Sequence, residues 1–145
     1  MTSRPAHLDR AREHRLRHTA VTLLRVVTGF LFFQHGAPKL FGSLPGSGEA
    51  EPAAELLTLI GFSGVLEVAG GILIMLGLFT RPVAFVLAGE MAVAYFMAHA
   101  PRGFWPGANG GELAALYAFV FLFFAASGAG RCSLDERRSV RSVDG

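Results

Sequence analysis

The chain has 145 residues; 52% are hydrophobic and only 17% are charged, and the mean hydropathy of +0.44 is high for a soluble protein. The net charge of +2 comes from arginines near the two ends of the chain, which argues against nucleic-acid binding and favours contact with anionic lipid headgroups. The single cysteine, Cys132, excludes an intramolecular disulfide and a dithiol redox site.

The N-terminal third predicts a basic tail followed by a membrane span. Residues 1–18 hold five arginines, and we expect a cytoplasmic tail that is either disordered or a short surface helix. Residues 19–36 are apolar and predict the first span, because at ~1.5 Å per residue they cover most of the ~30 Å hydrocarbon core. Pro38 predicts that the helix ends there, since proline cannot continue its hydrogen bonding.

The rest of the chain predicts three more spans. A loop rich in Gly, Pro and Ser at 42–52 is followed by a short interfacial helix at 53–60; the alternative is that this helix runs directly into the second span. The further spans are expected at 62–78, 82–98 and 111–127, with the membrane domain at 19–130 and a cytoplasmic tail at 131–145. Alanines repeat every fourth residue in the third span, a spacing that favours close helix contact and possible homo-oligomers.

Charge counts predict the orientation. Ten of the 13 Lys and Arg residues lie in the N-terminal tail, at Arg81 and in the C-terminal tail. The positive-inside rule therefore places both termini in the cytoplasm. The predicted fold is an all-α membrane protein, a bundle of four transmembrane helices surrounded by lipid.

Six residues are polar or ionisable at positions inside or at the ends of the spans: Arg25, His35, Glu67, Glu90, His99 and Glu112. A charge at a helix centre costs about 2.5–3.5 kcal/mol on insertion scales, so each should face a partner or a wet cavity. Their depths predict an inner Arg25–Glu90 pair. They also predict an outer group, which consists of His35, Lys39, Glu67, His99 and Glu112.

His35 is the strongest functional candidate, because it lies at the predicted helix end beside Lys39 and histidine is the side chain suited to proton transfer at physiological pH. Glu67 is equally consistent with a structural partner and a proton-handling group, whereas Glu112 simply complements a helix dipole. His99 is half a helical turn out of phase with Glu90, which argues against a haem held by His35 and His99. No thiolate cluster predicts zinc, and no metal site is expected.

The run LLRVVTGFLFFQHGAPKLFG resembles the first span of the DoxX family of small bacterial integral membrane proteins. The E-x-x-G-G and G-L-x-T-R-P elements of GVLEVAGGILIMLGLFTRP and the ending GAGRCSLD are also similar to that family, with Ala129 in place of its usual proline. The matching positions are Arg25, His35, Gly36, Lys39, Glu67, Gly70, Gly71, Arg81 and Asp135. The resemblance implies a four-helix domain in the bacterial inner membrane and a link to quinone-coupled redox chemistry.

Three functions follow as hypotheses. The first is a quinone- or quinol-binding subunit of a membrane redox system, with His35 and Glu67 catalytic and Lys39 stabilising a quinone oxyanion. The substrate-binding residues would then be Lys39, Arg25, Glu90, His99 and Glu112, and the electrons would pass to a partner oxidoreductase. The second is a membrane anchor or assembly factor for partner oxidoreductases. The third is a small-molecule carrier, for which four short spans are few.

Overall fold

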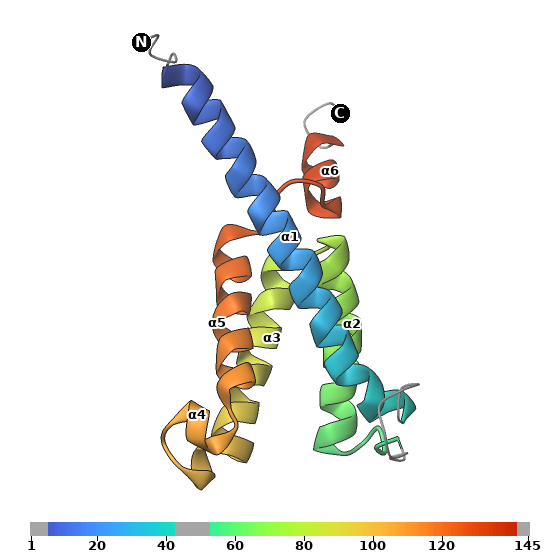
Figure 1. Ribbon diagram of the computed structural model, residues 1–145. Helices are drawn as coiled ribbons and strands as arrows, with labels where there is room; N and C mark the ends of the chain where they lie inside the picture. The colour runs from blue at the N-terminus through green and yellow to red at the C-terminus, as the bar shows by residue number, and fades with distance from the viewer. Residues whose placement is uncertain (1–5, 43–52, 142–145) are drawn as a thin grey trace.

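The computed structural model describes residues 6–42 and 53–141, and every regular element in those ranges is a helix (Figure 1). The elements are α1 (Ala6–Phe41), α2 (Leu59–Leu76), α3 (Thr80–Ala94), α4 (Pro106–Asn109), α5 (Glu112–Ser127) and α6 (Leu134–Arg141). A π-helical turn at Tyr95–His99 and a 3-10 turn at Ala100–Arg102 follow α3. The all-helical prediction is therefore confirmed for the described residues.

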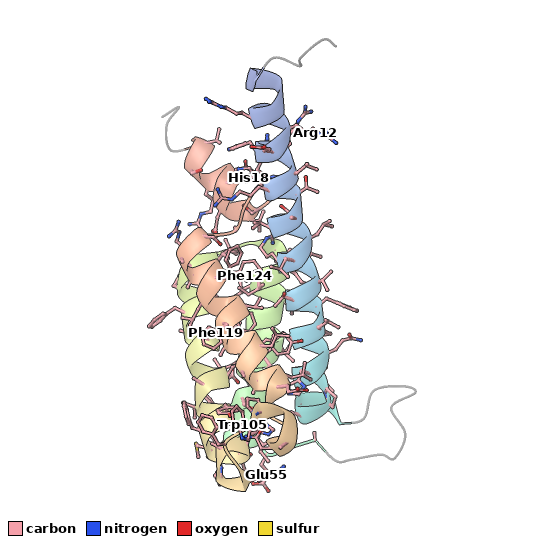
Figure 2. The ribbon with its side chains drawn as sticks, turned by 60° about the vertical axis from the view of Figure 1, so that its left-hand side comes forward. Arg12, His18, Glu55, Trp105, Phe119 and Phe124 are labelled. Atoms are coloured by element: carbon pink, nitrogen blue, oxygen red, sulfur yellow. The ribbon has the colours of Figure 1, made fainter. Side chains whose placement is uncertain are left out.

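Four of these helices form an elongated bundle, in which α1 packs along α2 and α3 packs along α5 (Figure 1). The first part of α1 projects beyond the bundle at the end where α6 lies, and α4 lies at the opposite end. In Figure 2, Arg12 and His18 mark the first of these ends, and Trp105 and Glu55 mark the other. Basic helix extensions and an aromatic loop therefore occupy opposite ends of one apolar bundle.

Within residues 6–42 and 53–141, three helices are long and apolar enough to cross a membrane: Arg12–Phe41, Leu59–Leu76 and Thr80–Arg102. The helix α5 is also apolar but has only 16 residues. Large apolar side chains remain exposed on all of these helices; examples are Leu23, Phe85 and Phe119. A lipid surrounding accounts for such exposure, because a helix bundle in water turns these side chains inward.

The helix α1 is longer at both ends than the sequence predicts. It begins at Ala6, so residues 6–18 are neither disordered nor a separate surface helix but continue directly into the first span. It also runs through Pro38 to Phe41. Proline removes one hydrogen bond from a helix, but packing against a neighbouring helix compensates for that loss in a membrane protein. Here the buried Ala37 and the ion pair of Lys39 hold the last turn of α1 in place.

The predicted interfacial helix at 53–60 is wrong. Residues 53–55 are irregular, and α2 begins only at Leu59, after Thr58. The Thr58 Oγ1 accepts a hydrogen bond from Gly61 N at 3.1 Å and donates one to Glu55 O at 2.7 Å. Threonine is a favoured N-cap, so this local signal sets the start of the helix. The predicted loop at 42–52 lies, apart from Gly42, outside the described residues.

The predicted bounds of the third and fourth spans differ less from the structure. The third span begins at Thr80 and continues to Arg102, compared with the predicted 82–98, and α5 occupies Glu112–Ser127, compared with 111–127. The helix α2 ends at Leu76 and is capped by Gly77, whose φ of +64° is the left-handed conformation typical of a glycine after a helix. Gly77 N donates to Ile74 O at 3.0 Å, which closes the last turn.

Glycines bring α1 and α2 into close contact. A Cβ on Gly29 would lie 2.7 Å from Gly71 O, and a Cβ on Gly36 would lie 2.5 Å from the Cβ of Glu67. Glycine therefore has to occupy these positions for the two backbones to approach this closely. Behind this interface lies a core shared by α1, α2, α3 and α5, which contains Phe32, Ile74, Ala84, Leu87, Ala88, Met91, Ala118, Phe121 and Phe124.

Candidate functional site

The α1–α2 interface buries a glutamate and its ion pair. Glu67 is fully buried, and its Oε1 lies 2.7 Å from Lys39 Nζ. The same ammonium donates a hydrogen bond to Ser63 Oγ at 3.2 Å, and Ser63 lies one helical turn before Glu67. We call His35, Lys39, Ser63, Glu67 and Glu90 the Glu67 cluster. Lys39 and Glu67 are therefore in direct contact, as their depths in the two spans predict.

His35 forms the open edge of the Glu67 cluster. Its Nε2 lies 3.9 Å from Glu67 Oε1, and its side chain is 52% exposed. The distance exceeds that of a hydrogen bond, so the contact is electrostatic and becomes an ion pair only when the imidazole is protonated. His35 and Lys39 are four residues apart and therefore share one face of α1. This face places a titratable ring between the buried carboxylate and the surroundings of the bundle.

Gly36 explains how a glutamate is buried at this point. Because Gly36 has no side chain, α1 passes directly over the Cβ of Glu67. Gly64 does the same on α2, where a Cβ would lie 2.9 Å from the Cβ of Lys39. The two helices therefore seal the carboxylate from lipid while Lys39 neutralises it. Such sealing matters because an unpaired charge in the hydrocarbon region is strongly unfavourable.

Glu90 adds a second carboxylate from α3. It is close enough to Glu67 and Lys39 for the three groups to interact electrostatically. Both of its carboxylate oxygens are buried, and neither accepts a hydrogen bond from any described residue. The Glu67 Oε2 atom is likewise buried and has no hydrogen-bond partner among the described residues. The cluster thus contains three buried carboxyl oxygens without a hydrogen-bond partner among these residues.

Arg25 is not the partner of Glu90. The predicted Arg25–Glu90 pair is wrong, because the guanidinium instead binds backbone carbonyls at the other end of α2. It is 1% exposed and donates to Ile74 O at 2.8 Å, to Ala129 O at 2.9 Å and to Cys132 O at 3.0 Å. It also donates to Met75 O. Arginine has five donors in a rigid fork, so one side chain satisfies the exposed carbonyls of a helix end and of a turn.

Asp135 completes this second group. Its two carboxylate oxygens accept hydrogen bonds from Phe79 N at 2.8 Å and Thr80 N at 2.9 Å, which caps the start of α3. We call Arg25, Asp135 and the carbonyls that Arg25 binds the Arg25 clamp. Burial opposes ionisation of Asp135, but these hydrogen bonds and the charge of Arg138 outweigh it, so the pKa lies below its ordinary value. The clamp ties the segment before α6 to the α2–α3 turn.

His99 and Glu112 do not join His35, Lys39 and Glu67 through any contact among the described residues. His99 Nδ1 instead lies 3.3 Å from Asn109 O. Asn109 is the residue that sequence reasoning missed: it is buried, and its side-chain amide donates to Gly103 O at 2.7 Å. Asn109 is followed by Gly110, and an Asn-Gly pair is a sequence signal for a turn, so this signal could have identified Asn109 as a loop-stabilising residue. Glu112 is exposed in the first turn of α5, which suits a dipole-complementing residue.

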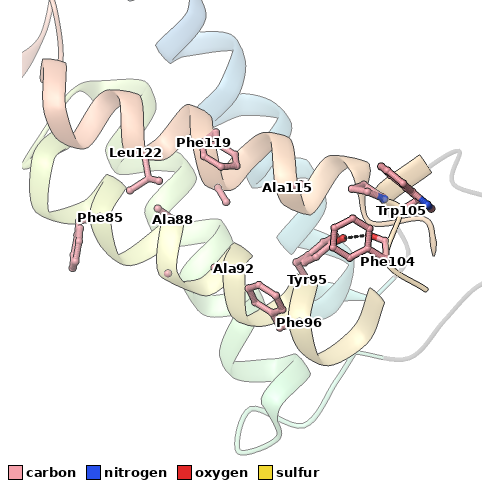
Figure 3. Close-up of a pocket in the computed structure, with 13 residues that line it drawn as sticks. Phe85, Ala88, Ala92, Tyr95, Phe96, Phe104, Trp105, Ala115, Phe119 and Leu122 are labelled. Atoms are coloured by element: carbon pink, nitrogen blue, oxygen red, sulfur yellow. Dashed lines mark hydrogen bonds between the residues drawn. The ribbon is translucent and has the colours of Figure 1, made fainter. Parts of the chain in front are cut away.

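A separate apolar groove of about 650 Å³ lies between α3 and α5 (Figure 3). Ala88, Ala92 and Phe119 lie along it, and Phe104 and Trp105 lie at its loop end. Tyr95 OH donates to Phe104 O at 3.1 Å, which holds the loop against the third helix. At about 100° per residue, Glu90 points away from Ala88 and Ala92. The groove and the Glu67 cluster therefore lie on different faces of α3.

The chain is similar to a protein family and to two relatives. The family model described as DoxX matches residues 20–100. The chain is 46% identical over 123 residues to an uncharacterized protein of Haemophilus influenzae, covering 81% of this chain and 89% of that protein. It is 31% identical over 141 residues to an uncharacterized membrane protein of Mycobacterium tuberculosis, covering 86% of this chain and 84% of that protein. No solved structure matches the chain.

Proposed function

The chain belongs to the DoxX family, and from this premise we propose that it binds a quinone or quinol at the Glu67 cluster and supports a membrane redox system. In this proposal α5 is a fourth span, both termini are cytoplasmic and the protein resides in the bacterial inner membrane. The positive-inside distribution of arginines supports the orientation, because the first part of α1 and α6 lie at the same end of the bundle.

One observation carries the proposal: a buried carboxylate is ion-paired to Lys39 and has a half-exposed histidine beside it. Reduction of a quinone consumes two electrons and two protons to give the quinol, and oxidation releases both. Proton transfer inside a membrane therefore needs a titratable group with access to its surroundings. His35 has that access, and the Glu67 carboxylate lies beside it on the buried side.

Lys39 has a distinct role in this proposal. Two of its three N–H donors are used by Glu67 Oε1 and Ser63 Oγ, and its side chain is 26% exposed. The fixed ammonium would stabilise negative charge that develops on a quinone oxygen. The electrons would come from, or go to, a partner oxidoreductase in the membrane. Arg25 has no such role in the proposal, because its donors already bind backbone carbonyls.

The test is photolabelling of the full-length protein in lipid nanodiscs with an azido-quinone that carries an isoprenoid tail. The wild type should be labelled, and excess unlabelled quinone should compete. His35→Ala and Glu67→Gln should reduce labelling severalfold, whereas Glu112→Gln, an exposed glutamate at the start of α5, should leave it unchanged. Labelling that both site variants retain would refute the proposal.

A second candidate function is a membrane anchor for a partner oxidoreductase. It is favoured by the exposed arginines Arg12, Arg15 and Arg17 on the part of α1 that extends beyond the bundle. Truncation after Gly130 would not test it cleanly, because Arg25 binds Cys132 O and Asp135 caps α3. Reversal of the three α1 arginines to glutamate leaves the clamp intact. Loss of a co-purifying oxidoreductase in that variant would support the anchor role, and its retention would exclude these arginines as the docking surface.

A further inference from the structure

Two histidines on the first part of α1 bring their ring nitrogens together. His14 and His18 are four residues apart, so they lie on one face of the helix. Their Nε2 atoms are 3.1 Å apart, and their ring centroids are 4.3 Å apart. His18 lies at the end of the molecule where α1 extends beyond the bundle (Figure 2). Two potential metal ligands therefore meet outside the apolar core.

The contact between the two rings is a poor hydrogen bond. When an imidazole N–H points straight at a second imidazole nitrogen, each ring centroid lies a full ring radius behind its own nitrogen. The centroids of His14 and His18 are closer than that arrangement gives, so at least one nitrogen points away from the line that joins them. Bending weakens a hydrogen bond steeply. In the tautomer protonated on Nδ1, each ring instead offers its Nε2 lone pair to an ion beside that line.

The distance between the Nε2 atoms suits two nitrogens that bind one metal ion. Zinc holds imidazole nitrogens at about 2.0–2.1 Å, so two nitrogens on one ion are about 2.9 Å apart at a right angle and about 3.3 Å apart at a tetrahedral angle. The 3.1 Å separation lies between these values. Two histidines at the same spacing on one helix face supply zinc ligands in the H-E-x-x-H motif.

The charges near the pair indicate the class of ion. The exposed Arg10, Arg15 and Arg17 each lie within one turn of a histidine, and Glu13 is the acidic residue nearest in sequence. Hard cations such as Mg²⁺ and Ca²⁺ bind carboxylate oxygens, so this surface is unfavourable for them. Borderline ions such as Cu²⁺, Ni²⁺ and Zn²⁺ meet the same repulsion, which salt screens at exposed positions. Their bonds to imidazole nitrogen offset it.

We propose that His14 and His18 form a binding site for one borderline divalent metal ion, with Cu²⁺ bound more tightly than Zn²⁺. The two Nε2 atoms supply two ligands and water fills the other positions, because no group of three or more His, Cys, Asp or Glu side chains gathers around a possible ion in the described part of the chain. The proposal departs from the expectation of no metal site, which considered thiolates and haem. Arg15 follows His14, where H-E-x-x-H has its catalytic glutamate, so the site binds an ion without hydrolytic chemistry.

The bound ion would stabilise the part of α1 that projects from the bundle (Figure 1). A helix segment without tertiary packing is marginal in water. The nitrogens of His14 and His18 meet when the residues between them are helical, so the ion favours the helical state over the unfolded one. The site is independent of the proposed quinone site, because His18 and His35 are about 25 Å apart along the helix axis.

The test is isothermal titration calorimetry of the full-length protein, without a polyhistidine tag, in phosphatidylcholine nanodiscs. The probes are Cu²⁺, Zn²⁺ and Mg²⁺. Wild type should bind Cu²⁺ more tightly than Zn²⁺ and should not bind Mg²⁺. His14→Asn and His18→Asn should each weaken the binding of Cu²⁺ and Zn²⁺ at least about tenfold, because the second ligand of a pair acts at a high effective concentration. His99→Asn removes a histidine elsewhere and should leave both affinities unchanged.

A relocated histidine separates geometry from the number of histidines. His18→Asn combined with Thr19→His keeps that number, but it puts the second ring about 140° around the helix from His14. This variant should bind Zn²⁺ as weakly as His18→Asn alone. Hydrogen exchange of the amides of residues 10–18 gives a second readout: Zn²⁺ should slow it severalfold in wild type and leave it unchanged in His18→Asn.

Three results would overturn the inference. The first is unchanged affinity for Zn²⁺ in His14→Asn or His18→Asn. The second is wild-type affinity in the variant with the relocated histidine, because the number of histidines and not their spacing would then determine binding. The third is binding of Mg²⁺ as tight as that of Zn²⁺, because oxygen ligands would then hold the ion.

Discussion

The Arg25 clamp and the Glu67 cluster lie at different levels of one bundle, and they treat buried charge in opposite ways. The guanidinium of Arg25 donates to four backbone carbonyls, so the hydrogen-bonding capacity of the charge is used within the protein. In the Glu67 cluster, three carboxylate oxygens accept nothing from the described residues. Satisfied buried polar groups rigidify a fold, whereas unsatisfied ones mark a place where something else binds or a proton is held.

This difference separates structural from functional candidates more clearly than residue type does. Both groups contain a buried ionisable side chain on or beside α1, and both use positions at which the chain resembles its family. The Glu67 cluster has a half-exposed histidine, His35, beside its buried carboxylate. If the clamp is purely structural, its loss should lower stability, and if the described contacts hold the cluster, their removal should be coupled.

The largest effect is expected from Arg25→Met. Removal of the guanidinium takes a donor from four carbonyls, of which Ile74 O keeps Gly77 N, and each buried acceptor left unpaired costs about 1–3 kcal/mol. Arg25→Lys should lose most of the same stability, because an ammonium cannot reach four carbonyls with one rigid fork. Denaturant unfolding in detergent micelles measures both losses. Arg12→Met, an exposed arginine on the same helix, should change little. Wild-type stability in Arg25→Lys would contradict the clamp.

The second effect concerns the glycines of the α1–α2 interface. Gly36→Ala should destabilise the protein by about 1–3 kcal/mol, because the added Cβ overpacks against Glu67. Gly89→Ala is the matched control, since nothing lies within 4 Å of a Cβ at that position. That variant should be neutral or more stable by about 0.5–1 kcal/mol. Equal destabilisation by the two substitutions would show that the interface is not as close as described.

The third effect is the coupling between Lys39 and Glu67. Lys39→Met and Glu67→Gln should each destabilise, but the double variant should lose less than the two losses added. The coupling energy for groups in direct contact is expected at about 0.5–3 kcal/mol. A parallel cycle of Lys39→Met with Glu112→Gln should be additive, because no contact joins these residues in the described ranges. Additivity in the first cycle would mean that the 2.7 Å ion pair contributes nothing.

The smallest effect is the cap on α3. Asp135→Ala should lower the free energy of unfolding by about 0.5–2 kcal/mol at neutral pH. Because the pKa of Asp135 is lowered in the folded state, its contribution is complete above the unfolded-state pKa of about 3.9 and is lost as the pH falls through the folded-state value. The difference between wild type and Asp135→Ala should thus stay constant from pH 7 to about 5 and shrink only below about 4. Glu13→Ala, an exposed control, should show no such difference. A difference that grows at acid pH would reverse the sign and refute the cap.

Sequence reasoning identified the helical architecture and part of the candidate site. Hydropathy and turn residues identified four apolar helices, and the depths of the residues in their spans placed Lys39 near Glu67. The same reasoning ended α1 too early at Pro38, because the loss of one backbone hydrogen bond is visible in the sequence and the compensating packing against α2 is not. It also placed a helix at 53–60, where Thr58 instead caps α2.

What the sequence determines by itself is which segments are apolar and where charges interrupt them, because both are local properties of the chain. The tertiary structure decides which partner each charge meets. Arg25 turns to carbonyls rather than to Glu90, and Glu90 keeps its oxygens without a donor among the described residues. Those outcomes depend on how the helices rotate and cross, and close glycine contacts such as Gly29 with Gly71 set that geometry.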